Sequence, residues 1–216
     1  MGYSRLMYET YQYLFPPRPG SQQAIPAEHL FLYEQMGWQA QIKKNGTANI
    51  IFVPPDRGRV IFKNRHGEDH KMWAPNSAAE RAFLALPGDG WCVFAAELLN
   101  SKVAGGTRNT NYIFDILVDN GTYLIGETFA DRQDRLYALF DEFEAEAESH
   151  YVVDTNTWVA KTFAAGFSAM FTGIIDPEDE GVVLKDPNAV LESCARASSN
   201  RVWSRKCRKQ HKNFAF

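Results

Sequence analysis

Short runs of β-branched and aromatic residues, separated by turn residues, constrain the fold of this 216-residue chain most. Asn45-Gly46 and Asp119-Asn120-Gly121 are typical of the tight turns that join neighbouring antiparallel strands. The sequence therefore predicts antiparallel sheets. The predicted strands cover residues 38–43, 48–53, 59–63, 91–98, 112–118, 122–125, 181–185 and 202–208.

Helices are predicted between these strands. Pro26 fits the first position of a helix that ends near Gly37, and Ser77 with Glu80 three residues later matches a capping box. Because helices and strands do not alternate as βαβ units, the predicted fold class is α+β, with antiparallel sheets flanked by helices. The other predicted helices cover residues 130–148, whose acidic residues 141–148 would face solvent, residues 156–172, and a short stretch from Asp186-Pro187.

Composition places the chain among globular domains and argues against several other classes. With 45% hydrophobic and 13% aromatic residues, the chain can build a packed core. No apolar run approaches the roughly 18 residues of a membrane span. The N-terminus lacks the apolar core of a signal peptide, so we expect a protein of the cytoplasm, or of the host-cell cytoplasm if the source is a virus. Cys92, Cys194 and Cys207 form no CxxC pair, which argues against a disulfide framework or a thiolate zinc site.

The chain is predicted to form a single domain, residues 1–216. Within it, residues 1–25 are a Tyr/Pro-rich lead-in, and residues 201–216 are a basic strand and tail. The formal net charge of −3 does not itself indicate a nucleic-acid partner, but this tail contains no acidic residue. This tail is either a surface that binds a polyanion or a solvated chain end, and Trp203 favours a tail that packs against the rest of the protein. Its basic residues are Arg201, Arg205, Lys206, Arg208, Lys209 and Lys212.

Lys43 stands where a predicted strand meets a Gly-containing turn, in the segment KKNG. A lysine amine has an ordinary pKa of about 10.4 and is protonated at neutral pH, so a nucleophilic lysine needs rigid support and neighbouring cations. Exposed hairpin turns often contain the same residue types. The segment by itself leaves both interpretations open, and the residues downstream decide between them.

Three downstream groups suit the binding of a nucleotide. Arg65, in the segment NRHG, can clamp phosphate or ribose oxygens through its guanidinium. Glu97 lies near the end of an apolar strand, where a carboxylate needs a partner such as a ribose hydroxyl. The segment YIFDIL, residues 112–117, offers an aromatic ring that can stack on a base.

Two predicted strands near the C-terminus carry further charges. Glu180 and Lys185 lie at opposite ends of the apolar segment EGVVLK. Lys206 and Arg208 share one face of the last strand, because side chains alternate between faces with a period of two. These charges are the kind that an anionic substrate and its metal ion require.

In this order, the segments resemble the motifs of the covalent nucleotidyltransferase superfamily, which comprises ATP-dependent DNA ligases, RNA ligases and messenger RNA capping enzymes. The resemblance extends over residues 43–208, and it implies the nucleotidyltransferase (ATP-grasp-like ligase adenylation) fold. KKNG matches the Lys-x-Asp-Gly motif, NRHG the arginine motif, AELL the Glu-Leu motif, YIFDIL the Phe-Asp motif, EGVVLK the Glu-Gly motif and RKCR the Lys-x-Lys motif.

The resemblance implies a chemistry centred on Lys43. Its amine would attack the α-phosphate of ATP and become a lysyl-AMP phosphoramidate. Lys185, Lys206 and Arg208 would face that phosphate as catalytic cations. A phosphorus that takes a fifth ligand accumulates negative charge, which fixed cations and a metal ion stabilise.

The resemblance also implies how ATP and a metal ion are held. Phe114 would stack on the adenine, and Gln41 is placed to read the adenine amino group. Glu180, together with Glu97, would bind the catalytic Mg²⁺ or Mn²⁺. The implied nucleotide-binding residues are Gln41, Ile42, Arg65, Glu97, Phe114, Glu180, Lys185 and Lys206.

The implied substrate is a nicked nucleic acid duplex, bound by a monomer. DNA is preferred to RNA because EGVVLK and the tryptophan before the last motif are more similar to DNA ligases. The alternatives are an RNA ligase, a capping guanylyltransferase, and a non-catalytic module that binds nucleotide or nucleic acid.

Some residues depart from the family pattern. Asn45 replaces the usual aspartate, Ala48 stands where an arginine is common, and Arg208 gives Lys-x-Arg in the last motif. The sequence is also expected to lack the oligonucleotide-binding domain of typical relatives, as a minimal phage-like core would. His66 and His70 are not expected to bind a metal, because Gly67 between them indicates a turn.

Overall fold

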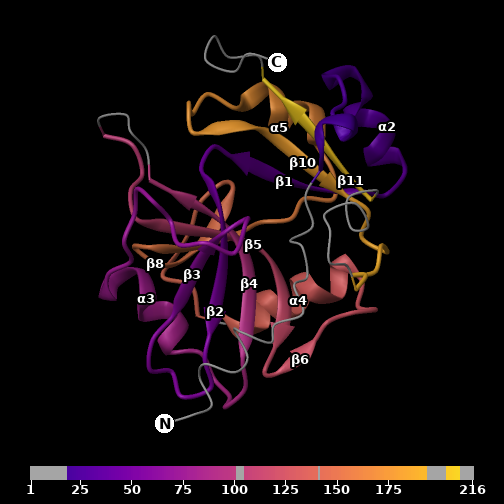
Figure 1. The fold of residues 1–216 in the computed structure, drawn as a ribbon. Helices are drawn as coiled ribbons and strands as arrows, with labels where there is room; N and C mark the ends of the chain where they lie inside the picture. The colour runs from indigo at the N-terminus through magenta and orange to yellow at the C-terminus, as the bar shows by residue number, and fades with distance from the viewer. Residues whose placement is uncertain (1–18, 101–104, 141, 194–202, 210–216) are drawn as a thin grey trace.

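The computed structural model describes residues 19–100, 105–140, 142–193 and 203–209. It confirms the predicted α+β class, with two sheets and flanking helices (Figure 1). The lead-in up to residue 18, Cys194 and the tail from residue 210 lie outside the described residues. No helix in the described part of the chain is both long and apolar enough to cross a membrane.

The larger sheet has eight strands among the described residues, in the order β3-β2-β4-β5-β9-β8-β7, with β6 paired to β5. Neighbouring strands run antiparallel except for β5 and β9, which are parallel. The strands are β2 (Thr47–Val53), β3 (Ile61–Asn64), β4 (Cys92–Leu99), β5 (Thr110–Asp119), β6 (Thr122–Tyr123), β7 (Ala145–Glu146), β8 (His150–Asp154) and β9 (Thr157–Ala160).

The smaller sheet has three strands among the described residues, β1 (Gln39–Lys44), β10 (Asp179–Lys185) and β11 (Ser204–Arg208). They are antiparallel, with β10 in the centre. One face of this sheet is apolar, because alternate residues of the three strands are aliphatic or small. Its buried members are Ala40, Ile42, Val182, Leu184 and Cys207.

Helices cover both sheets. They are the 3₁₀ turns η1 (Ser21–Gln23) and η2 (Ala27–His29), and the helices α2 (Leu30–Gln35), α3 (Ser77–Leu84), α4 (Phe129–Leu139) and α5 (Phe167–Gly173). Leu30 of α2 and Phe167 of α5 complete the apolar core on the outer face of the smaller sheet. The inner face of that sheet is left for polar side chains.

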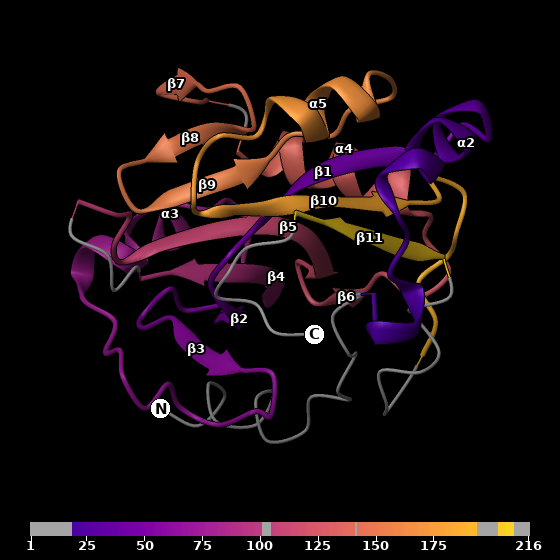
Figure 2. The same ribbon diagram turned by 90° about the horizontal axis from the view of Figure 1, so that it is seen from above.

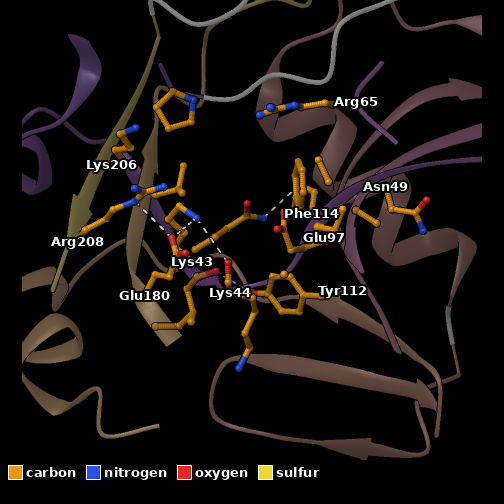
Figure 3. Close-up of a pocket in the computed structure, with 18 of the residues that line it drawn as sticks. Lys43, Lys44, Asn49, Arg65, Glu97, Tyr112, Phe114, Glu180, Lys206 and Arg208 are labelled. Carbon is orange, nitrogen blue, oxygen red and sulfur yellow. Dashed lines mark hydrogen bonds and ion pairs between the residues drawn. The ribbon is translucent and has the colours of Figure 1, made fainter. Parts of the chain in front are cut away.

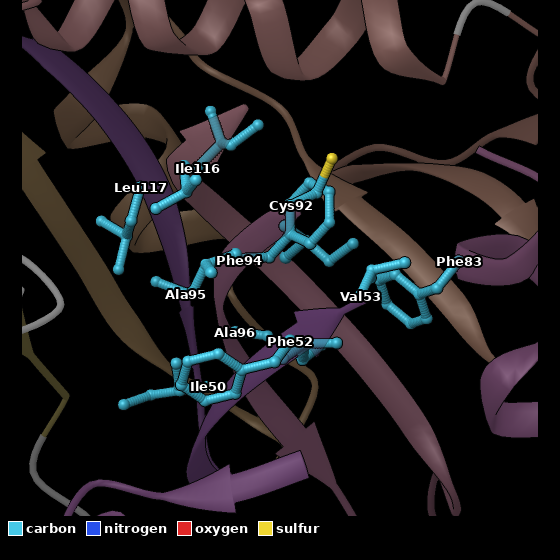
Figure 4. Close-up of a cluster of buried hydrophobic side chains, with 14 of the residues drawn as sticks. Ile50, Phe52, Val53, Phe83, Cys92, Phe94, Ala95, Ala96, Ile116 and Leu117 are labelled. Atoms are coloured by element: carbon cyan, nitrogen blue, oxygen red, sulfur yellow. The ribbon is translucent and has the colours of Figure 1, made fainter. Parts of the chain in front are cut away.

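The main core lies within the larger sheet and its helices (Figure 4). Phe83 of α3 packs on Phe94 of β4, with ring centroids 5.7 Å apart, and Leu136 of α4 is fully buried. Each such side chain contributes roughly 1.5–3 kcal/mol through removal from water. This burial fixes the central strands β2, β4 and β5.

The two sheets are joined directly at Asn45-Gly46, where β1 of the smaller sheet leads into β2 of the larger one (Figure 2). Gly46 lies so close to β4 that a Cβ atom there would stand 2.4 Å from the Leu98 carbonyl oxygen. The glycine of KKNG is therefore required by this close approach. The two lysines just before it are therefore held where the smaller sheet meets the larger one.

Two predicted helices are wrong in part. The helix predicted for residues 130–148 ends at Leu139, and the acidic segment after it contains strand β7. Phe143 stacks on Tyr151 of β8, with centroids 4.6 Å apart, so its ring packs beside a strand. The helix predicted for residues 156–172 begins instead as strand β9, because Val159 is buried in the sheet, and helix α5 begins only after Gly166.

Two predicted helix starts are also corrected. Asn76, not Ser77, caps α3, and its side chain accepts a hydrogen bond from the Ala79 N–H. The short helix predicted from Asp186-Pro187 is a turn, in which the Pro187 carbonyl accepts from the Ala130 N–H at the start of α4. A tertiary hydrogen bond outweighs the local preference for a helix here, because the turn supplies a carbonyl acceptor to the first turn of α4.

Candidate functional site

A cleft of about 530 Å³ lies between the inner face of the smaller sheet and the β2–β4–β5 part of the larger one (Figure 3). The structure brings every predicted site residue to this cleft. These residues are Gln41, Ile42, Lys43, Arg65, Glu97, Phe114, Glu180, Lys185, Lys206 and Arg208. A cleft of this size is within the range of small-molecule sites.

Strand register explains why residues far apart in the sequence share one wall. Lys43 of β1 lies opposite Gly181 of β10, which lies opposite Arg208 of β11. Gln41 and Lys206 are related in the same way through Val183. Residues opposite one another in antiparallel strands project from the same face of the sheet. The wall therefore carries Lys43, Arg208, Gln41 and Lys206 side by side.

Glu180 is turned toward Lys43 by an irregularity in β10. The pairing of β1 with β10 passes from Gly181 to Asp179, so Glu180 is the extra residue of a bulge. Gly181 has a φ of 147°, and a Cβ there would stand 2.0 Å from the Cys207 carbonyl oxygen, so only glycine fits. The Glu180 carboxylate lies 2.5 Å from Lys43 Nζ and 3.3 Å from Arg208 Nε.

A second lysine of the KKNG segment is held in the same manner. Lys44 Nζ lies 2.5 Å from Asp179 Oδ1, and both side chains are largely buried. Burial raises the pKa of Asp179, while Lys44 opposes this shift. The carbonyl of Glu178 accepts a hydrogen bond from the Asn45 N–H. Three consecutive acidic residues therefore contact three consecutive residues of KKNG.

Lys185 is fully buried at the base of the cleft. Its amine donates to the Phe114 carbonyl at 3.2 Å and lies 4.3 Å from the centroid of the Phe129 ring. Burial lowers the pKa of Lys185 to about 8, although nearby Asp115 opposes this shift. Asp115 is itself paired with Arg132 at 2.9 Å, with both side chains fully buried. The acid of the YIFDIL segment thus anchors α4 to β5.

Gln41 is also buried, and its amide nitrogen is already engaged. It donates to Gln133 Oε1 of α4 at 3.0 Å and to the Phe114 carbonyl at 3.4 Å. The prediction that Gln41 reads an adenine amino group requires an acceptor, and the side-chain oxygen of Gln41 can supply it. Gln133 does not line the cleft.

The opposite wall carries Arg65, Glu97 and Phe114 (Figure 3). Arg65 lies in the turn after β3, is exposed, and donates through Nε to His66 Nε2 at 3.0 Å. The ring of Phe114 lies 5.1 Å from Lys185 Nζ. A planar ring, a guanidinium and a carboxylate thus face the cations of the smaller sheet.

The residues that line the cleft fit an anionic nucleotide and a magnesium-type ion. Two carboxylates, Glu97 and Glu180, line the cleft. Six lysine and arginine side chains line it as well, namely Lys43, Lys44, Arg65, Lys185, Lys206 and Arg208. Mg²⁺ is typically held by one or two carboxylates together with substrate phosphates. No cluster of three or more His, Cys, Asp or Glu side chains suited to a metal occurs in the described ranges. His66 and His70 have separate partners, since His70 Nε2 contacts Asn49 Oδ1.

Sequence reasoning missed several residues of the site. Lys44 lies beside the candidate nucleophile Lys43, but its sequence context is typical of a solvated turn residue. Tyr112 was missed as well, and its hydroxyl donates to the Ile42 carbonyl at 3.1 Å. Burial raises the pKa of Tyr112 well above its ordinary value. Gln133 has no signal in the sequence, because its hydrogen bonds to Gln41 and Phe114 form only when α4 packs on β5.

Comparison with protein families gives a match to part of the chain. Residues 100–203, just under half of the chain, match the sequence model described as the ATP dependent DNA ligase domain. This stretch contains the YIFDIL and EGVVLK segments. Comparison of the sequence with curated proteins found no match.

Solved structures share the fold. A mycobacterial DNA ligase D complexed with ATP and MES superposes with a TM-score of 0.64 at 17% identity, over 92% of this chain and 61% of that one. The ligase domain of M. tuberculosis LigD gives a TM-score of 0.54 at 18% identity, over 78% of this chain and 54% of that one. A structure of Lig E DNA ligases gives a TM-score of 0.51 at 14% identity, over 91% of this chain and 68% of that one. The chain thus spans less than two thirds of the length of each of the first two structures.

Proposed function

We propose that this chain, which has the nucleotidyltransferase core of the ATP-dependent DNA ligases, seals nicks in duplex DNA through a lysyl-AMP intermediate. The observation that carries the proposal is the position of Lys43. Its amine lies in a cleft with five other lysine or arginine side chains, and the Glu180 carboxylate lies 2.5 Å away. This arrangement suits an attack on a phosphate.

In the first step, Lys43 Nζ attacks the α-phosphorus of ATP. A nitrogen–phosphorus bond forms, the bond to the oxygen that bridges to the β-phosphate breaks, and pyrophosphate leaves with the electron pair. The amine must lose a proton, and the Glu180 carboxylate is within reach to take it. Lys185, Lys206 and Arg208 are proposed to stabilise the negative charge that develops on the phosphorus oxygens.

Two further steps would complete sealing. An oxygen of the 5′-phosphate at the nick attacks the same phosphorus, which frees Lys43 and leaves an adenylylated end. The 3′-hydroxyl then attacks that 5′-phosphate, and AMP leaves. A divalent ion held by Glu180 and Glu97 would supply further charge neutralisation at the phosphates.

The remaining residues are proposed to hold ATP. Phe114 stacks on the adenine, Arg65 and Glu97 contact ribose and phosphate, and Gln41 with Ile42 lines the base end. Residues 1–216 would act as one adenylation domain and as a monomer. The folds of DNA ligase structures support DNA as the substrate class, and the ATP complex of a relative supports ATP.

The test is covalent labelling. The protein is incubated with ATP labelled at the α-phosphate and Mg²⁺, and is then run on a denaturing gel. We expect label on the wild type, none on Lys43→Ala, and undiminished label on the control Lys63→Ala, whose lysine does not line the cleft. Label from GTP alone would point to capping chemistry.

Absence of label on the wild type, with ATP binding retained, would contradict the ligase proposal and favour a binding module. If label forms, nicked DNA and nicked RNA duplexes separate the DNA from the RNA ligase. Sealing of the RNA duplex alone would overturn the DNA assignment.

A further inference from the structure

A chain of hydrogen bonds with a fixed direction runs from the backbone of β5 to the cleft. The pairing of β4 with β5 passes from Ile113 to Asp115, so Phe114 has no partner residue on β4. Pairing with β9 ends at Ile113. The Phe114 carbonyl therefore accepts from side chains instead, namely Gln133 Nε2 at 3.1 Å, Lys185 Nζ at 3.2 Å and Gln41 Nε2 at 3.4 Å.

This carbonyl decides which way two glutamine amides point. A carbonyl oxygen can only accept, so the Gln133 amide nitrogen must face it and the Gln133 oxygen must face away. That oxygen accepts from Gln41 Nε2 at 3.0 Å and from Thr162 Oγ1 at 3.3 Å. The nitrogen of Gln41 is thus directed toward Gln133, and the amide cannot flip without placing two oxygens together.

The remaining polar atom of Gln41 is its oxygen, Oε1. Within the described residues no hydrogen bond reaches this atom, although Gln41 is only 2% exposed and lines the cleft. An acceptor held in one orientation beside Phe114 matches a donor on the edge of a stacked base. The adenine 6-amino group is such a donor, whereas guanine presents an oxygen at the same position.

We propose that Gln133 is a specificity-determining residue, which positions Gln41 so that Gln41 Oε1 accepts a hydrogen bond from the adenine amino group. Gln133 does not touch the nucleotide and acts only through Gln41. The inference rests on the proposed function, because it requires a nucleotide in the cleft. It extends that function by assigning base selection to α4, outside the motif segments.

The experiment compares nucleotides that differ at one position of the purine ring. Rates of covalent labelling of Lys43 are measured with ATP, with the purine ribonucleoside triphosphate that lacks the 6-amino group, and with GTP. For the wild type we expect kcat/KM to favour ATP over the 6-deamino nucleotide by about 10-fold or more. In Gln133→Met this ratio falls toward one, through a rise in the KM for ATP.

Gln39→Met is the matched control, because Gln39 lies two residues before Gln41 on the same strand but does not line the cleft. It should keep the wild-type ratio. If Gln133→Met slows labelling by both nucleotides and leaves their ratio unchanged, Gln133 is merely structural and the inference is wrong.

The wild type alone can also overturn the inference. A ratio near one between ATP and the 6-deamino nucleotide would contradict it without any variant, while the ligase proposal would stand. A wild type that no nucleotide labels would instead contradict the ligase proposal, and the base-selection inference would fall with it. The two failures are therefore distinguishable.

Discussion

Lys185 shows how much a single buried charge depends on its surroundings. Its side chain is 2% exposed and contacts a backbone carbonyl and two aromatic rings, but no carboxylate among the described residues pairs with it directly. Burial therefore favours the neutral amine and lowers its pKa to about 8. Unfolding would return the pKa of this amine to its ordinary value near 10.5.

This shift predicts a dependence of stability on pH. Between about pH 8 and 10.5 the unfolded chain binds more protons at Lys185 than the folded chain, so the folded state gains stability as pH rises. Relative to Lys185→Met, the wild type should gain about 2–3 kcal/mol in unfolding free energy between pH 7 and pH 10. Urea unfolding at a series of pH values measures this difference. Parallel profiles for the two proteins would show that Lys185 keeps an ordinary pKa.

At the scale of elements, the pairing of β1 with β10 determines where Lys43 points. The register of these strands shifts at Lys43-Lys44, opposite the Glu180 bulge. The ion pair between Lys44 and Asp179 lies at this shift, with side chains 5% and 12% exposed. Removal of one partner of a buried pair leaves the other charge without compensation. The pair therefore stabilises the irregular register on which the site depends.

We predict that Lys44→Met lowers the unfolding free energy by about 3–5 kcal/mol. Labelling of Lys43 should fall as well, because the bulge that presents Glu180 loses its support. Urea unfolding and the labelling assay measure the two effects. Lys63→Met is the control, since its partner Asp69 is 87% exposed and the loss should be much smaller. Equal losses in the two variants would refute the role of Lys44.

For the whole molecule, the cleft depends on both sheets. Arg65 comes from the larger sheet and Arg208 from the smaller one, and each lines the cleft. A nucleotide held between them would bind the folded state only. Such a ligand adds about 2.7 kcal/mol of stability at 100 times its Kd.

We expect ATP to raise the Tm of Lys43→Met, a variant that can bind but not form the lysyl-AMP. Arg65→Ala and Arg208→Ala, each added to Lys43→Met, should both reduce this rise, since the two arginines hold the nucleotide from opposite walls. Differential scanning fluorimetry measures the shifts. A rise that only one of the arginine variants diminishes would place the nucleotide on a single sheet.

The sequence predicted the fold class and most strands, because alternating patterns and turn residues act locally. It was wrong where tertiary contacts outweigh local preference. Strand β9 reads as part of a helix, yet Val159 is buried in the sheet beside β5. The acidic segment after Leu139 reads as a helical face, yet Phe143 packs on Tyr151.

The prediction of the site shows the same contrast between local patterns and tertiary contacts. Lys43 and the other motif residues could be predicted because their spacing resembles that of a family, and the structure places all of them at one cleft. Lys44 and Gln133 could not, because their partners Asp179 and Gln41 lie far away in the sequence.

The sequence by itself determined most of the strands, the order of the motif segments and the glycines on which close approach depends. Gly46 and Gly181 are fixed in the sequence, although only the structure shows the carbonyls that exclude a Cβ. Tertiary structure alone decided that Glu180 faces Lys43 and that α4 orients Gln41. Both depend on register and on hydrogen-bond direction, which arise only when distant segments pack together.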